Sequence, residues 1–206
     1  MSKERLEAFS DGVIAIAITL LVLDLKVPPV GGGSLAHALG EQWPSYAAYV
    51  ISFLTIGIIW INHHAAMRRL RAVDHSVLTL NLLLLLCIGA LPFTTALIAE
   101  YLRASSGESL AAAVYAGSFL VMSISFYALE HHTLFNRAHL LHDEIREMDR
   151  VRIARRSRGG LMPYVVATAL APLSPYVTLG ICGAIALYYA LPSPPEPIGE
   201  QPARGD

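Results

Sequence analysis

Charged side chains are scarce in this sequence, and their scarcity excludes several classes of protein. Only 15% of its 206 residues are Asp, Glu, Lys or Arg, and the formal net charge is -1 at pH 7. Nucleic-acid binding depends on an excess of basic residues, so no nucleic-acid partner is expected. The two cysteines have neither disulfide nor zinc spacing. Neither a nucleophile elbow nor a His-Glu-x-x-His motif occurs. We therefore expect neither an enzyme nor a resident cofactor or metal.

Apolar residues dominate instead, at 54% of the sequence with a mean hydropathy of +0.51. A soluble helical bundle would need helices with polar faces, whereas the long segments here are apolar on every side. The sequence predicts an all-α membrane protein with one transmembrane domain over 1–191. The six expected spans cover 5–27, 46–67, 77–98, 110–130, 159–173 and 176–191. The first four reach the length of about 20 residues that a bilayer core requires, and the last two are expected to form a hairpin.

Basic residues predict the orientation in the membrane. Two precede the first segment, and further groups lie between segments two and three and between segments four and five. These residues are Lys3, Arg5, Arg68, Arg69, Arg71, Arg137, Arg146, Arg150, Arg152, Arg155, Arg156 and Arg158. Lys26 and Arg103 lie on the other side. The positive-inside rule then places both termini in the cytoplasm of a multi-pass cell-membrane protein.

Three connecting stretches carry expectations of their own. The stretch 137–158 alternates acids and bases at helical spacing, so it predicts a solvated helix near the inner leaflet or an extension of segment five. The Pro- and Gly-rich stretch 28–34 is expected to end the first helix. The Pro-rich tail 192–206 is expected to be a disordered cytoplasmic segment.

The first apolar segment has a distinct face on a helical wheel with about 100° per residue. With Ile16 at zero, Leu20 falls at about 40° and Leu23 at about -20°, and Val27 would extend the same stripe. Asp11 lies at about -140°, away from that stripe. The acid and the apolar stripe must therefore face different neighbours. One interpretation of Asp11 is a cap at the start of the helix, and lipid or another helix is the simplest partner for the stripe.

A second group of polar residues ends the next segment. Trp60 and His63 are expected at the membrane depth of Asp11, where an acid, a histidine and Arg5 can neutralise and hydrogen-bond one another. The indole N–H of Trp60 can join them. A metal site is the competing hypothesis, drawn from the histidines His63, His64, His131, His132, His139 and His142. Neither adjacent pair has the i, i+4 spacing that lets two imidazoles share one ion.

These residues together resemble a known family. The string Arg5-x-x-x-Phe9-Ser10-Asp11-Gly12, followed by Trp60-x-x-His63, is similar to the transmembrane protein 175 family of potassium channels. The length resembles its single-repeat bacterial members; animal members contain two repeats. The resemblance implies a homotetramer with the first helix lining the pore. It also implies potassium as the permeant ion and a constriction of large apolar side chains instead of a Thr-Val-Gly-Tyr-Gly filter, a string that is absent here.

Specific roles follow from that resemblance. It assigns the constriction to Ile16, Leu20 and Leu23, with the hydroxyl of Thr19 beside them. It assigns the packing and gating network to Arg5, Phe9, Ser10, Asp11, Trp60 and His63. The expected function is a potassium-over-sodium selective cation channel.

Other possibilities stay open from the residues. Asp24 can attract cations at the outer mouth, or it can pair structurally with Lys26. A metal-dependent membrane enzyme or transporter using the cytoplasmic histidines is one alternative function. A proton-leak pore is another.

Overall fold

The described part of the chain is all-helical. The computed structural model describes residues 2–30, 34–104 and 106–190. The elements in these ranges are helices, and one isolated β-bridge pairs Leu70 with Leu141. The predicted all-α class is confirmed. The expected disordered tail, 192–206, lies outside the described residues.

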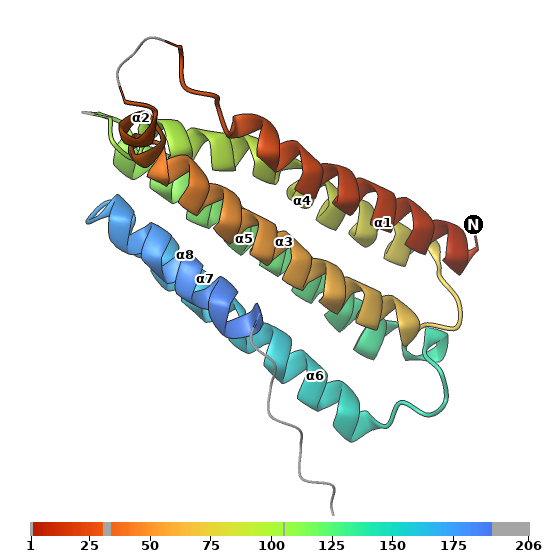
Figure 1. The fold of residues 1–206 in the computed structure, drawn as a ribbon. Helices are drawn as coiled ribbons and strands as arrows, with labels where there is room; N and C mark the ends of the chain where they lie inside the picture. The colour runs from red at the N-terminus through yellow and green to blue at the C-terminus, as the bar shows by residue number, and fades with distance from the viewer. Residues whose placement is uncertain (1, 31–33, 105, 191–206) are drawn as a thin grey trace, which may run out of the picture.

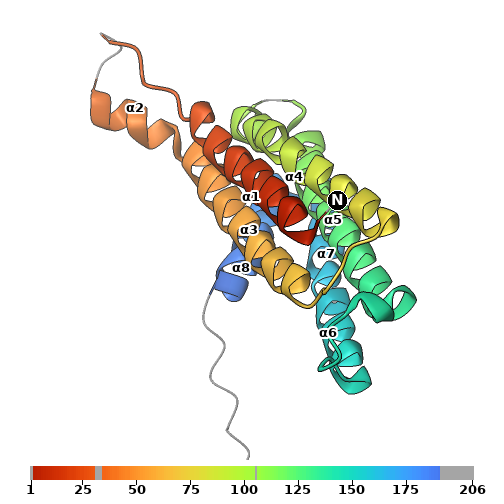
Figure 2. The ribbon, with the colours of Figure 1, turned by 90° about the vertical axis from the view of Figure 1, so that its right-hand side faces the viewer.

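Four helices are long and apolar enough to cross a membrane. They are α1 (Lys3–Leu20) with the 3-10 turn η1 (Leu21–Asp24), α3 (Trp43–Arg68), α4 (His75–Tyr101), and α5 (Glu108–His131) with the π-helical turn η2 (His132–Asn136). They run side by side as a bundle (Figures 1 and 2). In this bundle α1 packs against α3 and α4, while α5 packs against α4 on the side away from α1.

The first helix is shorter than the sequence predicted. Its α-helical part ends at Leu20, its 3-10 turn ends at Asp24, and Leu25 is extended. The expectation that the helix reaches Val27 is therefore wrong. The residue before a proline is disfavoured in the helical region, and Pro28-Pro29 follows Val27 directly. The last turn tightens to 3-10 geometry, as helix ends often do.

A short helix, α2 (Leu35–Glu41), precedes the second long helix. It was not predicted, because seven residues give too little periodicity to detect. Leu and Ala are strong helix formers, which explains why the segment folds this way locally. The helix α3 then begins at Trp43, three residues earlier than the expected segment 46–67.

The chain continues after α5 through the 3-10 turn η3 (Ala138–Leu140) into α6 (Glu147–Gly159), α7 (Leu161–Leu170) and α8 (Pro175–Ala190). Figure 1 shows α6 and α7 following one another along nearly the same line. The solvated helix thus extends the fifth apolar segment, the second of the two expected arrangements. α7 packs against α5, and α8 packs against α3 and α5. Both are shorter than the four long helices.

One end of the bundle is tied together by its connections. The backbone N–H of Arg71 donates to the carbonyl of Leu140 at 2.8 Å, and that of His142 donates to the carbonyl of Arg69 at 3.0 Å. Arg137 also forms an ion pair of 2.7 Å with Asp74. These contacts fasten the α3–α4 turn to the segment after α5, at the end where the N-terminus lies (Figure 1).

Candidate functional site: the two faces of the first helix

The first helix has one buried and one exposed face. Leu6, Ile14, Ala17 and Leu21 are at most 2% exposed and pack into the bundle. On the other face, Ile16 is 61% exposed, and Leu20 and Leu23 also stand free of the chain. A monomer thus leaves uncovered the apolar stripe that the helical wheel singled out.

The 3-10 turn aligns Leu23 with Leu20 in that stripe. Side chains three residues apart eclipse one another in a 3-10 helix, which has about three residues per turn. Leu23 lies in η1, three residues after Leu20, and is 73% exposed. It therefore stacks almost directly beyond Leu20 along the axis. Val27 lies beyond the end of the helix and does not belong to the stripe.

Thr19 lies on the exposed face beside the stripe. Its hydroxyl donates to the carbonyl of Ile16 at 2.9 Å. The proton of the hydroxyl is thereby used within the helix, and the oxygen lone pairs remain as acceptors. An oxygen in that state can contribute to the coordination of a cation.

Asp11 lies in the middle of α1 and bonds to α3. The helix starts at Lys3, so the interpretation of Asp11 as a cap is wrong; it lies about two turns inside. The indole Nε1 of Trp60 donates to Asp11 Oδ1 at 2.9 Å. This hydrogen bond joins the two helices and so helps to hold α1 against α3.

Ser10 lies on the buried face, where it links α1 to α4 and α3. Asn81 Nδ2 donates to Ser10 Oγ at 2.9 Å, and Ser10 Oγ donates to the carbonyl of Leu6 at 2.8 Å. His63 Nε2 lies 2.7 Å from Asn81 Oδ1. An amide oxygen only accepts, so in this arrangement His63 carries its proton on Nε2. All three side chains are at most 1% exposed.

Asn81 is a functional candidate that the sequence interpretation missed. It is a lone amide directly before the run Leu82-Leu-Leu-Leu-Leu86. A polar side chain within an apolar membrane segment is uncommon and usually faces the protein interior, and this signal could have identified it. In the structure it is the junction between Ser10 and His63.

Arg5 and Phe9 lie on the exposed face. Phe9 is 51% exposed, and Arg5 has no ion-pair partner among the described residues. The expected neutralisation of Asp11 by Arg5 is therefore absent within the described part of one chain. Of the six expected network residues, the structure brings together Ser10 with His63 through Asn81, and Asp11 with Trp60. Arg5 and Phe9 point away from both.

The C-terminal end of α1 and its surroundings carry a mixed set of charges. Lys26 Nζ forms its direct ion pair with Glu100 Oε2 of α4, at 3.1 Å. Its charge also acts on the nearby carboxyl of Asp24, with which a structural pair was the expected alternative. Arg103 pairs with Glu41 at 3.5 Å. Asp24 lines the same recess as these four residues and is half-buried. Acids and bases thus occur together in this recess.

The histidines of the described chain do not gather around a common point. No group of three or more His, Cys, Asp or Glu side chains in residues 2–30, 34–104 and 106–190 is arranged to hold a metal ion. His63 instead bonds to an amide, and His131 packs against the rings of Tyr127 and Phe135.

Long apolar helices joined by buried polar side chains define an α-helical membrane protein with several candidate spans. Comparisons with known proteins identify the family. The sequence model described as "Endosomal/lysosomal potassium channel TMEM175" matches residues 5–92. A potassium channel of Streptomyces collinus is 47% identical over 204 residues, which cover 97% of each chain.

A solved structure and an animal relative agree with this. The crystal structure of a lysosomal potassium-selective channel TMEM175 homolog from Chamaesiphon minutus has a TM-score of 0.81 and 40% identity, covering 91% of this chain and 96% of that one. An endosomal/lysosomal proton channel TMEM175 of Gallus gallus is 40% identical over 151 residues, 69% of this chain and 30% of its own. The chain belongs to the TMEM175 family, and the resemblance drawn from its first helix is confirmed.

Proposed function

We propose that this protein is a potassium-permeable channel that favours potassium over sodium, and that it is not an enzyme. Four copies surround a pore lined by α1 in the cell membrane. The observation that carries the proposal is the exposed apolar stripe of α1, in a chain 47% identical to a protein named as a potassium channel. A stripe of apolar side chains that the fold leaves uncovered is available to face copies of itself around an axis.

The proposed topology has six spans with both termini in the cytoplasm. The N-terminus, the α3–α4 turn and the basic segment before α7 lie at one end of the bundle (Figure 1). Their shared surplus of arginine supports a cytoplasmic position for that end. The shorter helices α7 and α8 complete the count as a hairpin packed against α3 and α5.

The proposed constriction is formed by Ile16, Leu20 and Leu23. Rings of such side chains leave a narrow apolar neck that closes by losing its water. Potassium holds its hydration shell less tightly than sodium does, so it sheds part of that shell at lower cost. Thr19, whose lone pairs are free, compensates for some of the lost water. Such a filter discriminates modestly, because it lacks the coordinating rings of carbonyls in other potassium channels.

In the proposed network, some residues make contacts within one chain and others contact a neighbouring copy. Ser10, Asp11, Trp60 and His63 hold α1 within its own chain, as the hydrogen bonds above support. Arg5 and Phe9, on the free face, contact a neighbouring copy near the cytoplasmic mouth. Asp24 attracts cations at the outer mouth.

Ion flux in proteoliposomes tests the proposal. We expect potassium flux to exceed sodium flux in the wild-type protein, and Ile16→Asn or Leu20→Ala to change conductance or selectivity. Leu86→Ala is the matched control, because Leu86 is 70% exposed but lies on α4. The mass of the detergent-purified particle tests the tetramer. Flux unchanged in both α1 variants would overturn the assignment of the constriction.

A proton path is the second candidate, favoured by the proton-channel name of the Gallus gallus relative. The same liposomes, loaded with a pH-sensitive dye and given only a proton gradient, distinguish it. The metal-dependent alternative predicts stoichiometric zinc or iron in purified protein. Full flux in metal-free protein would exclude that alternative.

A further inference from the structure

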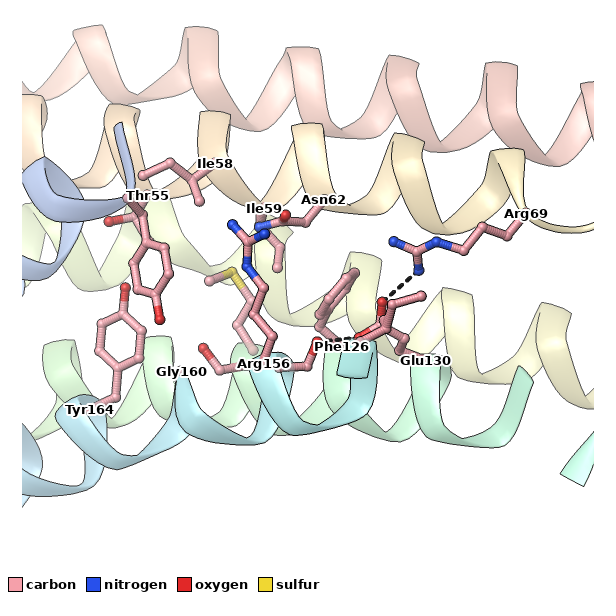
Figure 3. A pocket seen from close by; sticks show the side chains of 15 residues that line it. Thr55, Ile58, Ile59, Asn62, Arg69, Phe126, Glu130, Arg156, Gly160 and Tyr164 are labelled. Atoms are coloured by element: carbon pink, nitrogen blue, oxygen red, sulfur yellow. Dashed lines mark hydrogen bonds and ion pairs between the residues drawn. The ribbon is translucent and has the colours of Figure 1, made fainter. Parts of the chain in front are cut away.

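A cavity of about 180 Å³ lies between α3 and the α5–α7 side of the bundle. Figure 3 shows Thr55, Ile59 and Asn62 of α3 on one wall, with Arg156 of α6 and Tyr164 of α7 opposite. α1 does not line it, so the cavity is separate from the stripe assigned to ion permeation. A cavity of about 150 Å³ is large enough to hold a benzene-sized group, so this one accommodates part of a larger molecule.

The charges at one end of the cavity do not cancel. Glu130 is 4% exposed in its side chain and forms an ion pair of 2.7 Å with Arg69. Ser157 donates a second hydrogen bond to the same carboxylate. The charge of the acid is thus compensated within the protein, and each of its oxygens accepts a hydrogen bond. Any net charge at this end must come from another group.

Arg156 is that group. Figure 3 shows its side chain extending from α6 toward Asn62 and Ile59 of α3. No ion pair or hydrogen bond of its guanidinium occurs within the described part of the chain, and the residue is exposed. A guanidinium presents a planar fork of donors that matches phosphate oxygens. The cavity therefore offers an anion a free cation at its mouth.

The remaining wall is mostly apolar. Its apolar lining includes Ile58, Ile59, Met122, Phe126 and Tyr164, and Figure 3 shows Phe126 beside Glu130 and Tyr164 toward the opposite end. Glu130 lies near the C-terminal end of α5 and Arg156 in the last turn of α6. The helix α6 itself extends from the packed helices toward the end of the bundle that carries the N-terminus (Figure 1). An ion alone would gain nothing from these apolar side chains. A molecule with an anionic head and an apolar body would satisfy both ends.

We propose that the Arg156 cavity binds an acidic phospholipid from the leaflet that borders this end of the bundle. The phosphate pairs with the guanidinium of Arg156, and the first part of the lipid beyond the phosphate enters between Ile59, Met122 and Tyr164. The rest of each acyl chain stays in the bilayer, because the cavity is too small for it. This binding does not depend on which ion the protein conducts.

Native mass spectrometry of the full-length protein tests the proposal. Purified protein is titrated with phosphatidylglycerol and with phosphatidylcholine of identical acyl chains, and the ratio of the two affinities is the readout. We expect a preference for phosphatidylglycerol that falls at least about tenfold in Arg156→Gln, because a charge-assisted hydrogen bond is lost. Arg158→Gln is the matched control. It removes the same charge from the same helix, but about 200° around the axis from Arg156 and away from the cavity.

A second variant tests the contribution of the cavity to lipid binding separately from that of the Arg156 charge. Ser123→Phe fills the cavity while Arg156 stays in place, and we expect it to lower the affinity for phosphatidylglycerol. Circular dichroism and gel filtration confirm the folding of each variant. An unchanged lipid preference in Arg156→Gln, or an equal loss in Arg158→Gln, would overturn the proposal. Displacement of the lipid by inorganic phosphate with equal affinity would overturn the lipid assignment and leave a phosphate site.

Discussion

Replacing Asn81 tests whether the buried polar junction holds the first helix. In Asn81→Leu, the amide that accepts from His63 and donates to Ser10 is lost. The Nε2–H group of His63, in a residue that is 1% exposed, then has no acceptor. Burying an unsatisfied donor costs about 1–3 kcal/mol. Side-chain hydrogen bonds between membrane helices average about 0.6 kcal/mol each, so loss of two bonds gives about 1 kcal/mol. We expect a destabilisation of about 1–3 kcal/mol.

The double variant makes this test specific. Replacing both partners of a buried hydrogen bond by apolar groups is often nearly neutral, because no donor is left unpaired. His63→Leu combined with Asn81→Leu should therefore be more stable than the sum of the two single changes predicts. Unfolding in a titration of sodium dodecyl sulfate, followed by circular dichroism at fixed protein concentration, measures each free energy. Additive effects to within about 0.3 kcal/mol would refute the junction.

Three further predictions concern the ends and contacts of the helices. Trp60→Phe removes the donor to Asp11 and should destabilise the fold by about 1–2 kcal/mol in the same titration, whereas Asp11→Asn, which keeps an acceptor, should cost less. Asp74 accepts a hydrogen bond from the backbone N–H of Val77 and lies near Arg137, and both interactions lower the pKa of its carboxyl below the ordinary value of 3.8. The carboxylate therefore stabilises the fold above pH 3.8, and this contribution is lost as the pH falls below that value. Asp74→Asn should flatten stability against pH in that acid range. Gly107 has a φ of 86°, so Gly107→Ala should lower thermal stability by about 1 kcal/mol or more.

The helices were predictable where the sequence has long apolar segments. The segment 77–98 lies within α4 and 110–130 lies within α5, because about 20 apolar residues between polar flanks allow few other structures in a membrane. The helical wheel also placed Ile16, Leu20 and Leu23 on one face of α1, but it did not by itself predict that this face stays exposed. A regular helix fixes the angle between Ile16 and Leu20 before any partner is known.

The junction at Asn81 was not predictable to the same degree. Ser10 and Asn81 are 71 residues apart, and their contact depends on how α4 rotates against α1. No local periodicity sets that rotation; the packing of two whole helices does. The predicted end of α1 was wrong for a different reason. The wheel assumed α-helical geometry through Val27, whereas Pro28 ended it and tightened its last turn.

The exposed faces of α1 and α4 differ in a way that bears on what each one contacts. On α4, the exposed residues between positions 79 and 93 are mostly apolar; they are Thr79, Leu82, Leu83, Leu86, Gly89, Ala90 and Phe93. The exposed face of α1 also carries Arg5, Gly12 and Thr19. A cationic side chain and a hydroxyl are unfavourable against acyl chains, while a glycine permits close approach of another helix. Thr79 and Gly89 give the exposed face of α4 a hydroxyl and a glycine as well, so Arg5 is what sets the exposed face of α1 apart. In the proposed assembly, a water-containing axis shared by several copies accounts for Arg5 together with the apolar stripe.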